Sequence, residues 1–159
     1  MFKVGDKVVY PMHGAGVIEA IEEREFLGEK RQYYVMRMPI GDMKVMVPTD
    51  STEEVGLRRV MSRDDVEQVL SILKSKRTKM SNNWNRRYRA NMEKIKSGSA
   101  FEVAEVVRNL IQREQEKGLS SGEKKMLDSA RQILVSELVL AQNIDEEEAE
   151  SLVDQLAAN

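Results

Sequence analysis

The most chemically distinctive part of the 159-residue sequence is a basic segment, residues 74–96, which contains the only tryptophan, Trp84. The segment holds nine lysine or arginine residues and one acid, a local net charge of +8, whereas the whole chain carries −2. Clustered cations neutralise nucleic-acid phosphates and release counterions, so this segment is the natural footprint for DNA or RNA. A solvated helix face is the alternative, and a charge run alone favours it.

Trp84 stands at the expected first turn of a helix whose apolar stripe continues with Tyr88, Met92 and Ile95. Two interpretations of this tryptophan stay open on its position alone. It could anchor the core, as tryptophans in small domains often do. It could also be an apolar wedge placed against bases, which would favour distorted or melted DNA over a particular sequence. In the second interpretation its neighbours would contact phosphates: Arg86, Arg87 and Arg89.

Nothing in the sequence favours catalysis. There are no cysteines and only one histidine, His13, so neither a transition-metal site nor a nucleophile–histidine site is expected. The pair Gly14-x-Gly16 has no third glycine and no P-loop lysine, and tight turns explain it better than a phosphate loop. We expect no catalytic residue, no metal and no cofactor.

The composition is that of an intracellular protein outside the membrane. No apolar run approaches the roughly 20 residues that span a bilayer, and the first six residues lack the apolar stretch of a secretion signal. The absence of cysteine fits a reducing compartment. We therefore expect a cytoplasmic location.

The residues in question must be positioned by two halves of different character. All three prolines and six of the nine glycines fall in residues 1–56, the punctuation of short strands and turns. Apolar and β-branched runs predict strands at Lys7–Tyr10, Gly16–Glu25, Arg31–Met38 and Lys44–Val47. Four or five short strands in so few residues imply a small twisted barrel or sheet. We place this β domain at residues 1–54.

From Leu57 onward there is no proline and the apolar period changes to about 3.6, which predicts helices. Capping boxes at Ser62 and Ser120 begin the first and fourth of about five helices, and the last begins after Asp145. The second and third are expected near residues 83–98 and 100–118. We assign residues 55–61 to a linker and 62–159 to an all-α bundle, and therefore an α+β two-domain fold.

Six segments spread over the chain form a pattern in a fixed order: Phe2–Pro11, His13-Gly14, Gly41-Asp42 with Val45–Pro48, Asn83–Asn91, Ala104–Arg108 and Gly118–Ala130. In these segments the chain resembles the CarD/CdnL family of bacterial RNA polymerase-binding regulators along essentially its whole length. Phe2–Pro11 alone also resembles the polymerase-interaction module of transcription-repair coupling factors, and the other segments in this order are more specific.

The resemblance implies a Tudor-like or SH3-like N-terminal domain that docks on the β-subunit lobe of RNA polymerase. It also implies a helical domain that reaches the upstream fork of the transcription bubble, where a family tryptophan wedges into the minor groove and stabilises the open promoter complex. That position matches Trp84, and basic residues beside it match Arg86, Arg87 and Arg89. A family arginine in the second strand matches Arg24. A second basic position is Met46 here, so that polymerase contact would be apolar or absent.

We therefore expect a monomeric, non-enzymatic transcription regulator whose partners are the RNA polymerase β subunit and promoter DNA, and which reaches the nucleoid through polymerase. The alternative from the same basic segment is an architectural DNA-binding protein that acts without polymerase. A third possibility is an adaptor whose helical half binds another protein.

Overall fold

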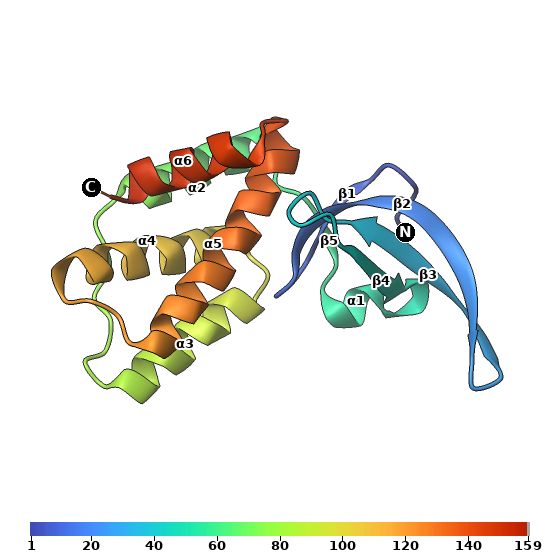
Figure 1. Ribbon diagram of the computed structural model, residues 1–159, viewed down its shortest axis with the longest axis horizontal. Helices are drawn as coiled ribbons and strands as arrows, with labels where there is room; N and C mark the ends of the chain where they lie inside the picture. The colour runs from blue at the N-terminus through green and yellow to red at the C-terminus, as the bar shows by residue number, and fades with distance from the viewer. Residues whose placement is uncertain (159) are drawn as a thin grey trace.

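The computed structural model describes residues 1–158, which form a β-sheet domain and a helical domain side by side (Figure 1). The sheet lies at one end of the molecule and the bundle at the other, with the longest helix nearest the sheet. The α+β two-domain fold expected from the sequence is confirmed.

The sheet has five antiparallel strands in the order β4-β3-β2-β1-β5. Four of them lie within two residues of the predicted bounds. The fifth, β5, lies inside the segment expected to be a linker and pairs with β1, and two residues are too few to leave a pattern in the sequence. The strands are β1 (Lys7–Tyr10), β2 (Gly14–Phe26), β3 (Glu29–Arg37), β4 (Lys44–Pro48) and β5 (Arg58–Arg59).

The β2–β3 hairpin extends beyond the other strands (Figure 1). Its turn is Leu27-Gly28, and both residues have positive φ, 51° and 82°, as a two-residue type I′ turn requires. A bulge between Ile18 and Ala20 interrupts the ladder where the strands bend. The small core of this domain lies on one face of the sheet and contains Val8, Ile18, Tyr34, Met36, Met38, Val47 and Leu57.

Five long helices form the second domain, as predicted. Both capping boxes are present, at Ser62 with Asp65 and at Ser120 with Glu123, and the Asp145 side chain caps the last helix. A single helical turn, α1 (Thr52–Val55), follows the 3-10 turn η1 (Thr49–Ser51), and neither was expected. The long helices are α2 (Arg63–Lys74), α3 (Trp84–Lys96), α4 (Ala100–Glu116), α5 (Ser121–Gln142) and α6 (Glu146–Ala157).

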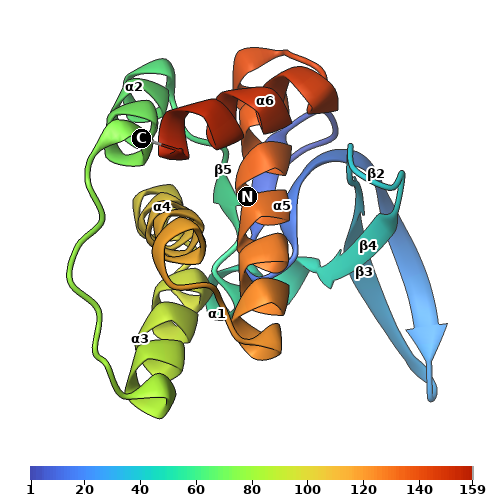
Figure 2. The same cartoon turned by 60° about the vertical axis from the view of Figure 1, so that its left-hand side comes forward.

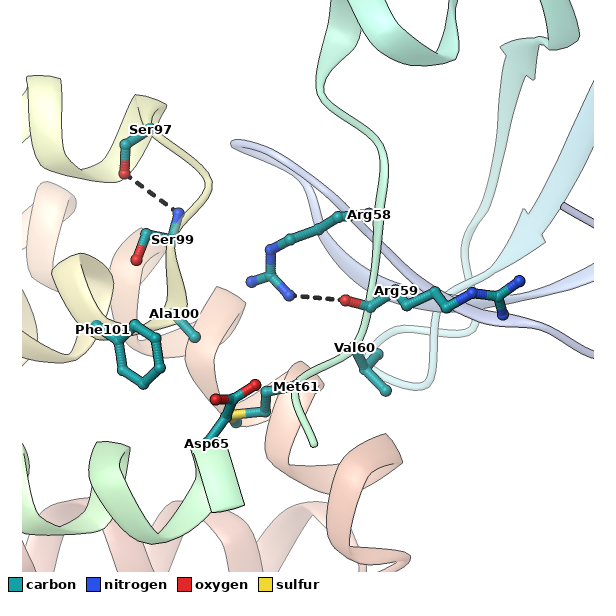
Figure 3. Close-up of a pocket in the computed structure, with 9 residues that line it drawn as sticks. All are labelled: Arg58, Arg59, Val60, Met61, Asp65, Ser97, Ser99, Ala100 and Phe101. Carbon is teal, nitrogen blue, oxygen red and sulfur yellow. Dashed lines mark hydrogen bonds between the residues drawn. The ribbon is translucent and has the colours of Figure 1, made fainter. Parts of the chain in front are cut away.

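Arg58 joins the two domains through a buried carboxylate. Its guanidinium donates to both oxygens of Glu137 in α5, each at 2.8 Å, and its Nε donates to the carbonyl of Gly98. Glu137 is 2% exposed and also accepts from the backbone N–H of Met61. Figure 3 shows Arg58 and Arg59 leaving β5 in opposite directions, with Arg58 toward the helices beside a hollow of about 400 Å³. Residues 55–61, which we expected to be a linker, are therefore held against the helical domain by these contacts.

A second contact joins α5 to β2, which lies against it (Figure 2). The Ser136 hydroxyl accepts a hydrogen bond from the backbone N–H of Ala15 at 2.9 Å. At Gly14, whose φ is 110°, a Cβ would lie 2.9 Å from the same hydroxyl oxygen. Only glycine permits both this conformation and this approach. Together with Arg58, the contact fixes the orientation of the two domains.

We predict that Arg58→Met lowers the free energy of unfolding by about 3 kcal/mol, because it leaves the Glu137 carboxylate buried without its cation. Urea unfolding followed by circular dichroism measures this. The matched control is Arg63→Met, which removes an exposed arginine and should change stability by less than about 0.5 kcal/mol. Equal effects of the two substitutions would contradict a structural role for Arg58.

Candidate nucleic-acid interface and polymerase-binding face

Trp84 is the first residue of α3, and its neighbours hold it in one orientation. The Asn83 side chain caps the helix by accepting from the Arg86 N–H at 3.0 Å. The indole Nε1 donates to the Ser120 hydroxyl at 2.9 Å, and the ring stacks on Tyr88 with centroids 5.0 Å apart. At Gly122 a Cβ would lie 3.4 Å from the indole, an ordinary van der Waals distance, so the ring lies close against the first turn of α5.

The exposed fraction of the Trp84 side chain shows whether this residue belongs to the core. The side chain is 42% exposed and does not belong to the buried cluster of the helical domain. A core anchor would be buried, and so this interpretation does not fit. What the structure has is a rigidly supported indole with one side in solvent, at the positive end of a helix.

Arg87 is not available to DNA, contrary to the expectation that it would contact a phosphate. Its side chain is 5% exposed and forms an ion pair with Glu123, which is 2% exposed, through Nε at 2.7 Å and Nη2 at 3.2 Å. A third nitrogen, Nη1, donates to the carbonyl of Ser81. Arg87 therefore holds the start of α3 against α5 and the preceding loop.

Glu123 is a buried acid that stays charged. Burial raises its pKa, but hydrogen bonds from Arg87 and Ser120 more than offset this, so the pKa of the carboxyl lies below its ordinary value. The same Ser120 hydroxyl that accepts from the indole caps α5 by accepting from the Glu123 N–H. The indole, the cap and the ion pair are thus one connected cluster.

Arg86 and Arg89 are exposed and lie three residues apart on α3, so their side chains are neighbours on the helix surface. Of the nine cations in residues 74–96, three form ion pairs: Arg77, Arg87 and Lys94. The other six are exposed and have no ion-pair partner within residues 1–158: Lys74, Lys76, Lys79, Arg86, Arg89 and Lys96. Much of the basic charge therefore faces solvent.

Buried polar side chains of α4 hold the loop 75–83 that leads to Trp84, a feature the sequence pattern did not indicate. The Asn109 side chain accepts from the Thr78 N–H, and that of Gln112 accepts from the Arg77 N–H and donates to the Ser75 carbonyl. The loop has no regular structure, yet its backbone is pinned to a helix. The backbone that carries its cations is therefore held in place.

Arg24 and Met46, the expected polymerase contacts, lie on the same face of the sheet. Met46 pairs with Val35, which pairs with Ala20, and Arg24 follows Ala20 by an even number of residues. This face is opposite the one that carries Tyr34 of the core. Arg24 is exposed, and within residues 1–158 its only ion pair is with Glu22 of its own strand. Met46 belongs to β4, an edge strand that a partner's strand could extend.

His13 packs on the ring of Tyr10, and its Nδ1 lies 3.1 Å from the carbonyl oxygen of Pro11.

No group of three or more potential metal-binding side chains occurs among residues 1–158. Within the same range, no helix has both the length and the apolar character to cross a membrane.

Comparison with known proteins identifies two family domains in the chain. Residues 2–61 match the CarD-like/TRCF RID domain, an RNA polymerase-interacting domain, and residues 68–154 match the CarD C-terminal domain. The chain belongs to the CarD family. It is 46% identical to a Bacillus subtilis (strain 168) protein named "Putative transcription factor YdeB", over 95% of this chain and 99% of that protein.

A solved structure is also similar in part: the solution structure of the 72-residue N-terminal domain of Myxococcus xanthus CarD. The two are 36% identical, the match covers 37% of this chain and 79% of that one, and the TM-score is 0.33. With its CarD-family relatives, this chain is a transcription regulator, and the family is of a transcription-factor type rather than a known enzyme class.

We predict that Arg87→Met lowers the free energy of unfolding by about 3–5 kcal/mol, because the buried Glu123 carboxyl then loses its cation. Arg89→Met, a control on the same helix, should change it by less than about 0.5 kcal/mol. Urea unfolding distinguishes them. If Arg87→Met is as stable as the control, the buried pair is not structural.

The pair also predicts a pH dependence. The folded-state pKa of Glu123 is lowered, so its contribution to stability is fully present above the unfolded value of 4.5 and is lost as the pH falls through the folded value. The stability difference between the wild-type chain and Glu123→Gln should therefore be constant near neutral pH and shrink below about pH 4.5. Urea unfolding of both chains across this range measures it, and a difference independent of pH would contradict the lowered pKa.

Proposed function

We propose that this CarD-family protein binds the β-subunit lobe of RNA polymerase through its sheet and stabilises the open promoter complex by wedging Trp84 into the minor groove at the upstream fork of the bubble. Arg86 and Arg89 contact the flanking phosphates. No catalytic step is involved. The protein acts as a monomer in the cytoplasm and reaches the nucleoid through polymerase.

One observation carries the proposal: a half-exposed indole supported on three sides and flanked by exposed arginines. A side chain already fixed by Ser120 and Tyr88 loses little conformational freedom when it stacks on a base. Stacking tolerates any base, so the contact responds to the geometry of the fork more than to its sequence. Burying the indole between bases removes apolar surface that is otherwise in water.

The effect on transcription follows from differential binding. A protein that binds melted promoter better than closed promoter shifts the equilibrium toward the open complex by its preference, about tenfold for each 1.4 kcal/mol. Docking on polymerase makes the DNA contact intramolecular, so a weak contact is sufficient. The outward-facing Arg24 and Met46, on the domain that matches the RID family, support docking through this face.

We predict that Trp84→Ala shortens the lifetime of the open complex on a purified promoter by about tenfold, since stacking on a base contributes about 1–3 kcal/mol. Binding to polymerase should be unchanged. Trp84→Phe keeps an aromatic ring but no indole donor, and its lifetime should lie between the two. Dissociation after addition of a competitor gives the lifetimes.

Circular dichroism and urea unfolding of Trp84→Ala supply the control. If the helical domain unfolds, the indole is a structural anchor. If the fold is intact and the open-complex lifetime is that of the wild type, the wedge is wrong and the adaptor alternative is favoured.

We predict that Arg24→Glu weakens polymerase binding at least tenfold and leaves DNA affinity unchanged. The matched control is Lys30→Glu, which makes the same charge change on the same hairpin but on the opposite face of the sheet. Co-purification of polymerase with each variant tests this. Equal retention of both variants would remove Arg24 from the interface, and failure of the wild type to retain polymerase would favour a DNA-binding protein that acts alone.

A further inference from the structure

A basic pocket lies between loop 75–83 and the last turn of α4. One of its lining residues, Asn82, is two residues before Trp84 in the chain. Its volume is about 360 Å³, and four of its lining residues are cations: Arg77, Lys79, Arg113 and Lys117. Thr78 and Asn82 add polar groups to the wall. Figure 2 shows this loop running beside α4 to the start of α3.

Arg113 lines this pocket, and one nitrogen of its guanidinium is shielded from solvent. Its Nε is buried and has no hydrogen-bond partner among the atoms of residues 1–158. Buried donors are nearly always paired, because leaving one unpaired costs free energy. The Nε–H and a neighbouring Nη–H are the two parallel donors with which arginine binds two oxygens of a phosphate or a carboxylate.

The charge of the pocket favours an anion. Of the four cations, Arg77 alone has an ion pair, with the exposed carboxylate of Glu116. Lys79, Arg113 and Lys117 have no acidic partner within residues 1–158. With Glu116 counted, the local charge is +3, which outweighs the partial negative charge at the end of α4.

The pocket is also built before any ligand arrives. Asn109 and Gln112 of α4 fix the backbone of Arg77 and Thr78, and Arg87 holds the other end of the loop at the carbonyl of Ser81. Cations on a fixed backbone lose less freedom on binding than those on a mobile loop. The backbone that carries these cations therefore lies at a constant position relative to Trp84.

We propose that this pocket binds one backbone phosphate of the promoter DNA, with the guanidinium of Arg113 and the ammonium of Lys117 as its principal donors. The inference rests on the proposed DNA contact of Trp84 and adds a second, separate point of attachment. Because the pocket and the wedge are joined by a pinned loop, the phosphate contact orients the duplex while the indole meets the bases.

The test is the affinity of the full chain for a forked duplex, measured by fluorescence anisotropy over a range of salt concentrations. For Arg113→Gln with Lys117→Gln we expect about tenfold weaker binding at low salt, and a slope of log affinity against log salt reduced by about one. The control, Arg63→Gln with Lys30→Gln, removes the same charge at exposed positions outside both the basic segment 74–96 and the pocket, and should stay within about twofold of the wild type. Equal losses for the two double variants would overturn the proposal, as would failure of the wild-type chain to bind the fork at low salt.

Nuclear magnetic resonance of the Arg113 side chain in the wild-type chain needs no variant that could misfold. The Nε–H signal should shift on addition of the forked duplex at concentrations where inorganic phosphate has no effect. A shift with inorganic phosphate alone, with none from the duplex, would assign the pocket to a small phosphate ligand and overturn the DNA contact.

Trp84→Ala separates this proposal from the wedge. If the pocket variant loses affinity while Trp84→Ala leaves open-complex lifetime unchanged, the phosphate site stands and the wedge fails. The reverse result retains the wedge and overturns the pocket.

Discussion

The ion pair between Arg87 and Glu123 determines where the exposed groups of the helical domain lie. A buried pair is costly unless both ions are fully hydrogen bonded, and here the guanidinium also reaches Ser81 while the carboxylate accepts from Ser120. The loop before α3 and the first turn of α3 therefore meet the first turn of α5, 36 residues further along the chain, at one charge pair. Trp84 takes its orientation from this cluster through Ser120, so a pair that is almost hidden from solvent fixes the part of the surface proposed to meet DNA.

Local rules predicted most of the fold. Strand bounds followed from alternation and from proline and glycine, and helix starts at Ser62 and Ser120 followed from capping boxes. The placement of Trp84 at a helix start was also predictable, because Asn83 is a good cap. All of these rules depend on residues that are only a few positions apart in the sequence. Features with little local signal were missed: β5 has two residues and α1 has four, so tertiary pairing rather than pattern produces them.

The candidate site was only partly predictable, because a sequence does not say which charges have distant partners. Arg86, Arg87 and Arg89 look equivalent in a basic run, yet Arg87 alone finds an acid 36 residues away. Glu123 was identified as a capping residue, which it is, but nothing local marks its second partner. Asn109 and Gln112 likewise resemble a solvated helix face, whereas they are buried and hold an irregular loop in place. The apolar pattern of a helix locates its buried face from apolar residues alone, so buried polar residues such as these are not predicted.

The helix α5 links the indole of Trp84 to the sheet and fixes the distance between them. Its N-cap residue, Ser120, accepts a hydrogen bond from the indole, and its Ser136 accepts one from the backbone of β2. At 1.5 Å per residue these points are about 24 Å apart along the axis. The helix therefore fixes a rotation as well as a distance between the two contacts. One inserted residue would rotate one end relative to the other by about 100°, and the indole would then point away from a target to which the sheet is bound. Between those two points, the number of residues is as constrained as their identity.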